Sequence, residues 1–344
     1  MSATPATPAP AVEALAALPG RKTDLIPAVV IVAFALLALP LVGSASTWIT
    51  LTLAALAMGM MLFIMASGMT LVFGLMDVMN LGHAAFVAIG AYAATSFARP
   101  LSPWLDSGSA VENVAAVGVV ALAAMLATAV VGWVFERLFI KPAQGNHLKQ
   151  ILITIGAMII IEQLLLVLWG ANQMMLPLPT ALRGALVFGD VAVERYRLVS
   201  VGVGLLVFAG LSLMLARTRI GLLIRAGVEN REMVEALGYR IRRLFVAVFV
   251  ASAGLAGLGG TMWGFYREQF TVSIGAEVLV QILIVVIIGG LGSVTGCFAA
   301  AILIALGTNY VSFLAPDFAL VSNIVVMMLV LLWRPRGLCP LATQ

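Results

Sequence analysis

Charged side chains are scarce in this chain. Asp, Glu, Lys and Arg make up 10% of its 344 residues, against about 25% in soluble domains, and 62% of the residues are hydrophobic. That composition excludes a soluble globular domain and predicts a protein with several membrane-spanning helices. Aromatic residues are also few, at 8%, and they form no face with the basic residues. The net charge of +4 therefore does not indicate a nucleic-acid partner.

Cysteine and histidine are rarer still, with two of each. Cys297 lies in an apolar segment and Cys339 in the C-terminal tail, so a disulfide between them is not expected. His83 and His147 are far apart, and no cluster of His, Cys and carboxylates has metal-ligand spacing. Walker A, HExxH and GxSxG sequences are also missing. We therefore predict no catalytic residue, no metal site and no cofactor bound by this chain.

The N-terminal segment differs from the rest of the chain. Residues 1–20 are rich in Ala and Pro with one charge, Glu13, and we predict a disordered cytoplasmic tail over residues 1–22. Residues 23–344 are then a single transmembrane domain. Its first apolar run, 25–42, begins late and exceeds the core of a signal peptide, which has roughly 7–15 residues. It is therefore predicted to be a retained helix.

Apolar runs dominate the remainder, and a helix needs about 20 such residues to cross roughly 30 Å of hydrocarbon. Two candidate segments fall short: 80–98 begins with Asn80, Gly82 and His83, and 277–290 has only about fourteen residues. Each is expected to be a broken or re-entrant helix that lies inside the protein or against a water-filled cavity. The predicted fold is all-α with about 8–10 transmembrane helices, drawn from residues 25–42, 49–73, 80–98, 111–135, 150–169, 198–216, 244–265, 277–290, 294–313 and 318–333.

The basic residues favour a topology with both termini in the cytoplasm. With the N-terminus inside, fourteen of the nineteen Lys and Arg residues fall on the cytoplasmic side. Losing both short segments would leave both termini inside, so this bias does not fix the number of crossings. The largest loop on the other side, 170–197, contains Pro177, Pro179, Gly184 and Gly189. It is predicted to form a small extracytoplasmic hairpin.

One charged stretch, residues 217–243, interrupts the apolar segments on the cytoplasmic side. It holds seven arginines against three glutamates. Asn230 suits a helix N-cap, Glu232 the first turn and Gly238 the stop, which predicts a short helix from about Arg231 to Leu237. A short capped helix in this position is typical of a docking element for a soluble partner. An ordinary positively charged loop is the alternative.

A few polar residues fall in or beside the apolar segments. Asp77, Asn80 and His83 are spaced three apart, so on a helix they would share one face. They are interpreted either as lining or gating a substrate pathway or as capping a broken helix. Glu162 and Gln281 are further pathway candidates, with a structural hydrogen bond to a neighbouring helix as the alternative.

Several short sequence motifs are not distinctive one by one, but their order and spacing along the chain are specific when taken together. They are GLMDVMNLGHAAF (74–86) with Gly90-Ala-Tyr92, FERLFIKP (135–142), RTRIG (217–221) with Arg225-Ala226, Asn230 and Ala236-Leu-Gly238, GGLGSVTG (289–296) and RPRGL (334–338). Over roughly residues 49–340 the chain therefore resembles the permease subunits of branched-chain amino acid ABC importers. It resembles the LivH-type subunit more than the LivM-type, because of the Glu136-Arg137 and Lys141-Pro142 pairs.

The resemblance implies a type II-like importer in the bacterial inner membrane. A second permease subunit, LivM-like or another copy of this chain, would complete the pore in the lipid bilayer. Two cytoplasmic ABC ATPase subunits would hydrolyse ATP, and a periplasmic binding protein would deliver the substrate. The residues implied in coupling to the ATPases are Arg225, Ala226, Glu229, Asn230, Ala236 and Gly238.

Other interpretations remain open at this point. The family resembled also includes importers of urea, short amides and other amino-acid-like ligands. A secondary transporter coupled to an ion gradient would prefer ionisable groups at mid-membrane, where only Glu162 qualifies. A membrane-embedded enzyme would need a catalytic cluster, and no such motif is present.

Overall fold

The structure is a computed structural model that describes residues 26–76, 80–143, 145–229 and 231–339. The predicted tail, residues 1–22, lies outside these ranges. Every apolar segment expected to cross the membrane is a helix in the described part of the chain, so the all-α prediction is confirmed. These helices are α2 (Ile26–Val42), α3 (Ala45–Met76), α4 (His83–Ala98), α6 (Ala110–Phe135), α7 (His147–Trp169), α8 (Arg195–Arg217), α11 (Ile241–Arg267), α12 (Ile274–Gly289), α13 (Val294–Leu314) and α14 (Ala319–Trp333).

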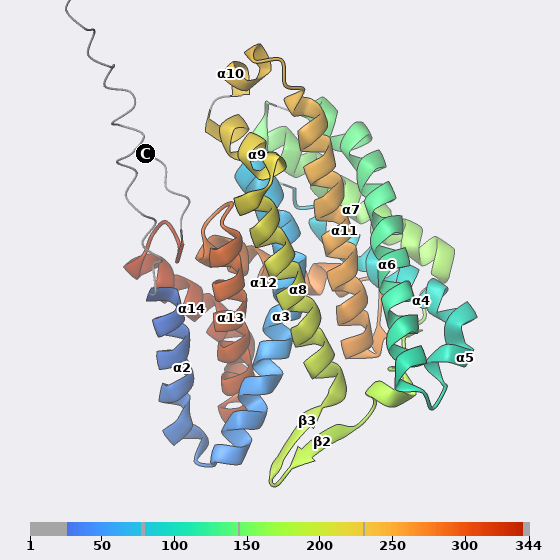
Figure 1. Cartoon of the computed structure of the whole chain (residues 1–344), viewed down its shortest axis with the longest axis vertical. Coiled ribbons are helices and arrows are strands. Elements are labelled where there is room, and N and C mark those ends of the chain that lie inside the picture. The colour runs from blue at the N-terminus through green and yellow to red at the C-terminus, as the bar shows by residue number, and fades with distance from the viewer. Residues whose placement is uncertain (1–25, 77–79, 144, 230, 340–344) are drawn as a thin grey trace, which may run out of the picture.

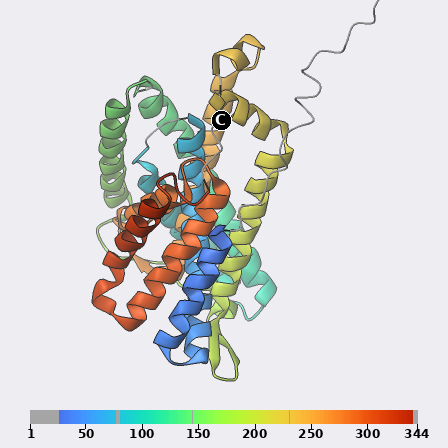
Figure 2. The same ribbon diagram turned by 90° about the vertical axis from the view of Figure 1, so that its left-hand side faces the viewer.

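Short elements occupy the two ends of this bundle. At one end, α9 (Arg219–Glu229) and α10 (Arg231–Ala236) follow α8; at the other, β2 (Ala185–Phe188) pairs with β3 (Val191–Glu194). Figure 1 places α10 and this hairpin at opposite extremes, and Figure 2 shows the same separation from the side. We call these the α10 end and the hairpin end. The remaining short elements are η1 (Arg99–Leu101), α5 (Ser102–Leu105), the π-helix η2 (Glu136–Ile140), η3 (Lys141–Ala143), η4 (Thr180–Leu182), η5 (Pro316–Phe318), and the paired strands β1 (Met174–Met175) and β4 (Gln269–Phe270).

Length separates the ten apolar helices given above into two groups. Six are long and apolar enough to cross a membrane: α3, α7, α8, α11, α13, and α6 with its continuation to Ala143. The other four, α2, α4, α12 and α14, have 15 to 17 residues. Such helices extend only about 22–26 Å, which is less than the roughly 30 Å of the hydrocarbon core.

Helix α4 begins in the interior of the bundle. The ring nitrogen Nε2 of His83 lies 2.9 Å from the carbonyl oxygen of Met65 in α3. Met65 is eleven residues before the end of α3 at Met76, about 16 Å along the helix axis. The chain therefore turns back into the bundle after α3, and α4 runs from that depth toward the hairpin end.

Helix α12 crosses the other half of the bundle, the half that α4 does not cross. In its first turn, Gly275 packs against the backbone of Ala84, at the start of α4. Just after its last turn, Gly292 packs against Gly74 near the end of α3. Helix α12 therefore runs from the depth where α4 begins toward the α10 end. The two segments that were expected to be broken or re-entrant are thus half-crossing helices that start at a common depth.

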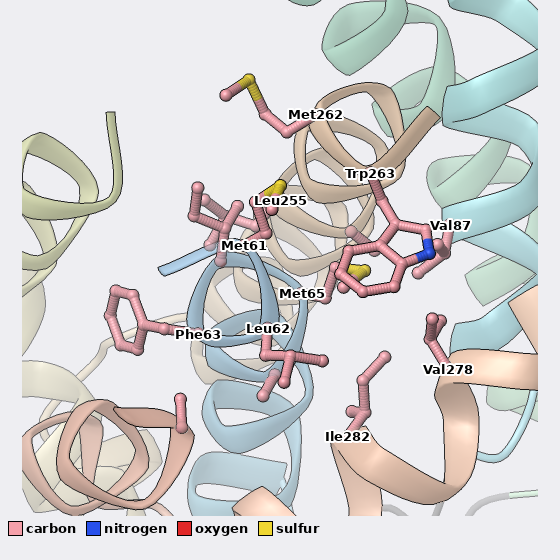
Figure 3. Packing of buried hydrophobic residues seen from close by; sticks show 14 of the residues in the cluster. Met61, Leu62, Phe63, Met65, Val87, Leu255, Met262, Trp263, Val278 and Ile282 are labelled. Carbon is pink, nitrogen blue, oxygen red and sulfur yellow. The ribbon is translucent and has the colours of Figure 1, made fainter. Parts of the chain in front are cut away.

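The core forms where α3, α4, α11 and α12 meet. Figure 3 shows Met65 of α3 beside Trp263 of α11, Met61 of α3 next to Leu255 of α11, and Val278 of α12 facing the same core. Small residues bring the backbones close together in this region: a Cβ at Gly260 would lie 2.8 Å from the carbonyl carbon of Val87 in α4. Close backbone approach of this kind stabilises helix pairs where lipid provides no hydrophobic driving force.

The hairpin predicted within residues 170–197 is present as β2 and β3. Its strands pair Phe188 with Val191, so Gly189 and Asp190 form a two-residue loop. Gly189 has a φ of 62°, and a positive φ at the first loop residue is the pattern of a type II′ turn. The glycine that suggested a turn in the sequence is therefore the residue that the turn requires.

Candidate functional site

The α3–α4 junction contains two of the predicted pathway residues. Asn80 and His83 are both almost fully buried, at 2% and 1% exposure, whereas Asp77 lies outside the described residues. The predicted common helical face is wrong for Asn80 and His83, because α4 begins only at His83 and Asn80 precedes it in a turn. Gly82 permits this turn, since a Cβ there would lie 2.7 Å from Cζ of Phe135.

The hydrogen bond of His83 gives that residue a structural role. A carbonyl oxygen can only accept, so the His83 ring carries its hydrogen on Nε2 and donates to Met65. The Cε1 atom of the same ring lies next to Gly68 of α3. His83 therefore fastens the buried start of α4 to the middle of α3.

Replacing His83 by alanine should destabilise the folded protein. The change removes a buried hydrogen bond and leaves a cavity against α3, which together amount to about 2–4 kcal/mol. Thermal unfolding of the purified protein in detergent measures this effect, with the exposed His147→Ala as the control. Equal melting temperatures for the two variants would contradict a fastening role for His83.

Asn80 is a buried polar group with no hydrogen-bond partner among the residues that the structure describes. Neither its Oδ1 nor its Nδ2 is bonded within that part of the chain, and the side chain makes no cap on α4. The Oε1 atom of Gln150 on α7 is likewise buried and unpaired, one helical turn before Thr154, whose carbonyl oxygen lies beside Gly82. Buried polar groups are normally satisfied, so this junction retains unused capacity for hydrogen bonds. The sequence alone did not indicate Gln150, because a single amide near a helix start is not distinctive.

The other two pathway candidates lie on different helices. Glu162 on α7 and Gln281 on α12 are both half-buried. Within the described part of the chain, no hydrogen bond or ion pair joins either of them to the other or to Asn80. The structure therefore does not bring these predicted residues together into one cluster, and their role in a pathway stays a prediction.

The α10 end contains the predicted short helix. Gly238 has a φ of 86°; its N–H donates to the carbonyl of Glu235 at 3.0 Å, and the N–H of Tyr239 donates to the carbonyl of Val234 at 3.3 Å. These two bonds form a Schellman motif, so the predicted stop at Gly238 is confirmed. Ala236 is exposed, and the predicted N-cap Asn230 lies outside the described residues.

A second helix, α9, precedes α10 and was not predicted from the sequence. The predicted coupling residues Arg225, Ala226 and Glu229 lie on its backbone. Its apolar residues recur at helical spacing, with Leu223 and Ile224 on the packed side. That periodicity was the available signal, and the seven arginines of the stretch obscured it.

A small hydrophobic cluster fixes both helices to the bundle. Val234 of α10 is buried with Ile241 and Phe245 of α11, and Leu223 and Ala226 of α9 pack against them, as does Met76 at the end of α3. The cluster joins the three consecutive helices α9, α10 and α11 to the end of α3. Helices α9 and α10 therefore form a braced protrusion, and a force applied to α10 reaches α3 through packed side chains.

The tip of this protrusion exposes large apolar side chains. Met233 is 59% exposed, Leu237 70% and Tyr239 52%. In Figure 1 the tip extends beyond the membrane helices. Exposed apolar groups gathered on a protrusion typically mark a protein interface. These three residues were not predicted from the sequence, where charge, caps and small residues drew attention instead. We call Met233, Leu237 and Tyr239 the tip patch.

The described residues contain no group of three or more His, Cys, Asp or Glu side chains that could hold a metal ion. A bundle with two half-crossing helices, an unsatisfied amide at their shared depth and a braced protrusion is the architecture of a polytopic membrane transport subunit.

The chain belongs to the family described as the branched-chain amino acid transport system / permease component, whose sequence model matches residues 51–333. It is 26% identical over 291 residues to the high-affinity branched-chain amino acid transport system permease protein BraD of Pseudomonas aeruginosa, across 82% of this chain and 92% of that protein. It is 23% identical over 283 residues to LivH of Escherichia coli K12, across 80% and 90% of the two chains. No solved structure matches it.

A LivM permease protein is also similar, but over a shorter region. The LivM protein of Escherichia coli K12 is 33% identical over 135 residues, which is 37% of this chain and 30% of that protein. LivH and BraD are matched over almost their whole length, so the predicted LivH-type subunit is confirmed. The relatives are permease proteins, which agrees with the prediction that this chain is a transport subunit.

Proposed function

We propose that this chain is the LivH-type pore subunit of an ATP-driven importer for branched-chain or related amino acids. A LivM-like subunit or a second copy of the chain completes the pore in the inner membrane. Two cytoplasmic ATPase subunits bind and hydrolyse ATP, for which this chain contributes no cofactor site. A periplasmic binding protein delivers the substrate at the hairpin end, where residues 170–197 form the largest loop.

The braced protrusion with its exposed tip patch is the observation that supports this proposal most directly. A secondary transporter, which is driven by an ion gradient, has no need of a rigid apolar tip outside the membrane helices. An ATPase that closes on the tip patch pushes α10, and the packing of Met76 with the α9–α11 cluster carries the displacement to α3. The coupling segment in this proposal is residues 217–243.

The proposed orientation puts the α10 end in the cytoplasm and the hairpin end outside. In a cysteine-free background, Ala185→Cys on β2 should react with an impermeant thiol reagent in intact cells. In cells that express the permease without its ATPases, Tyr239→Cys at the tip should react only after the cells are permeabilised. Labelling of position 239 but not of position 185 in intact cells would reverse the proposed topology.

The proposed function is tested with the complete complex in proteoliposomes. Uptake of radiolabelled leucine should require both ATP on the ATPase side and the binding protein on the other side. Imposed proton or sodium gradients without ATP should produce no uptake. Gradient-driven leucine uptake would instead identify a secondary transporter, and ATP-driven uptake of urea without leucine would identify an amide importer.

A further inference from the structure

A cavity of about 360 Å³ opens at the hairpin end, away from the α3–α4 junction. It lies between the end of α4, the short helices η1 and α5, and the chain around β1. Its lining combines opposite charges with apolar side chains, and we call it the hairpin-end pocket: Arg99, Ser102, Leu105, Asp106, Met174 and Leu176. Cavities that bind small molecules typically measure about 300–1,000 Å³, so this one suits a single small solute.

The two charged residues of the pocket are not paired with each other. Arg99 and Asp106 are both exposed, and neither makes an ion pair with any described residue. Seven residues separate them, about two helical turns along η1 and α5, which places them toward the same face. The pocket therefore presents one free guanidinium and one free carboxylate to the same small volume.

The apolar part of the pocket is buried and supported by hydrogen bonds. Leu105, Met174 and Leu176 are each less than 10% exposed. Met174 belongs to β1, which pairs with β4 at the end of α11, and the N–H of Leu176 donates to the carbonyl of Glu268 at 2.8 Å. This wall is thereby fixed to the core helix α11, and it does not depend on the surface loop alone.

A single buried amide holds the opposite wall. Nδ2 of Asn113 on α6 lies 3.0 Å from the Trp104 carbonyl oxygen and 2.9 Å from that of Ser107, and its Oδ1 accepts from the N–H of Ala181 at 2.8 Å. Asn113 is fully buried. It ties the segment that carries Asp106 to the loop beyond β1, so the pocket is formed before any ligand arrives. A preformed site avoids part of the entropic cost of binding.

We propose that the hairpin-end pocket binds the zwitterionic form of an amino acid with an apolar side chain. Arg99 binds the α-carboxylate, Asp106 binds the α-ammonium group, and the side chain packs against Leu105, Met174 and Leu176. This inference rests on the proposed function and specifies where the solute is first held by the permease. A neutral amide such as urea would use neither charge fully, so the pocket favours an amino acid.

The test measures ligand binding to the purified importer complex in nanodiscs without its binding protein. Three probes differ in one charge each: L-leucine, 4-methylpentanoate without the ammonium group, and 3-methylbutylamine without the carboxylate. The unaltered complex should bind leucine best. Asp106→Asn should weaken leucine binding about tenfold, because one charged hydrogen bond is lost. The variant should then bind leucine no more tightly than 4-methylpentanoate. Arg99→Gln should remove the advantage over 3-methylbutylamine in the same way.

Matched controls change the same charges elsewhere at the hairpin end. Asp190→Asn in the β2–β3 loop and Arg183→Gln beside β2 lie outside the pocket lining and should leave the preference among the three probes unchanged. A pocket variant that weakens all three probes equally would point to lost structure and contradict the assignment. Failure of the unaltered complex to bind leucine would also overturn it.

Uptake by the same variants separates this inference from two alternatives. When loaded binding protein is titrated to saturation, Asp106→Asn should lower the maximal uptake rate and leave the half-saturating concentration of binding protein unchanged. A higher half-saturating concentration with normal leucine binding would assign the surface to docking of the binding protein and overturn the inference. Absence of ATP-driven uptake by the unaltered complex would refute the proposed function itself, independently of these variants.

Discussion

Replacing Gly260 by alanine will prevent α11 from packing on α4. A Cβ at this position would overlap the backbone carbonyl oxygen of Val87 and approach its Cα to 3.0 Å. All the opposing atoms are backbone atoms, so no side-chain rotation can relieve the overlap, and the helices must separate. Overpacking a core typically costs about 1–3 kcal/mol even where side chains adjust, and here a helix axis must move. We expect most of the variant to be lost from the folded fraction.

The control for Gly260→Ala is the same substitution where space is open. Gly118 on α6 and Gly202 on α8 both lie inside long helices, and a Cβ at either would have no neighbour within 4 Å. Gly118→Ala and Gly202→Ala should therefore fold normally, with any small gain coming from helix propensity. The measurement is the monodisperse fraction after detergent extraction, together with the melting temperature. A Gly260→Ala protein that matches the Gly118→Ala protein in both would refute the close contact.

The membrane helices could be predicted because their information is local. Each apolar run is long, and the lipid environment requires a helix wherever a run crosses it. The two half-crossing helices were expected for the same reason, since 80–98 has few large aliphatic residues and 277–290 is short. Their shared starting depth could not be predicted, because it depends on the His83–Met65 bond and on Gly275 against Ala84, contacts between distant segments.

The candidate sites show where sequence patterns stop being sufficient. A spacing of three residues predicts a shared face only if both residues lie on the same helix. Helix α4 begins at His83, after the turn at Gly82, so Asn80 lies outside it. The stop of α10 was predictable, because Gly238 adopts a left-handed conformation that other residues avoid. The tip patch was not, since exposure of Leu237 depends on how α9 and α11 brace the helix. The hairpin-end pocket draws on segments about 75 residues apart, which no local pattern connects.

Burial also changes how the predicted polar residues are interpreted. His83 was considered for a pathway because polar groups are costly in a membrane, yet its bond to Met65 already satisfies it. Asn80 has no such bond, so of the two it is the residue still available to a solute or to buried water. A pathway from the hairpin-end pocket to the α3–α4 junction would follow α4. This helix starts at His83, and Arg99 of the pocket directly follows its last residue.

Replacing Leu237 by aspartate should release the ATPases from the permease or uncouple them. Leu237 is 70% exposed at the tip, and its neighbours Met233 and Tyr239 extend the same patch. If an ATPase cleft receives this patch, a carboxylate there is buried without a partner, which is costly. Central interface residues commonly contribute about 2 kcal/mol or more, so we expect about thirtyfold weaker association. Ala236→Trp should cause a comparable loss by steric overlap at the exposed small residue beside it.

Phe188→Asp provides the matched control for Leu237→Asp. Phe188 is 68% exposed, nearly the same as Leu237, but it lies in β2 at the opposite end of the bundle. Both variants keep the core and the cluster of Val234, Ile241 and Phe245 intact, so both should fold. Co-purification of the ATPases, ATP hydrolysis and leucine uptake are measured in parallel for each. Leu237→Asp should lose ATPase retention, or should hydrolyse ATP without uptake, whereas Phe188→Asp should retain its ATPases. Normal retention together with normal uptake in both Leu237→Asp and Ala236→Trp would show that α10 is not the element on which the ATPases act.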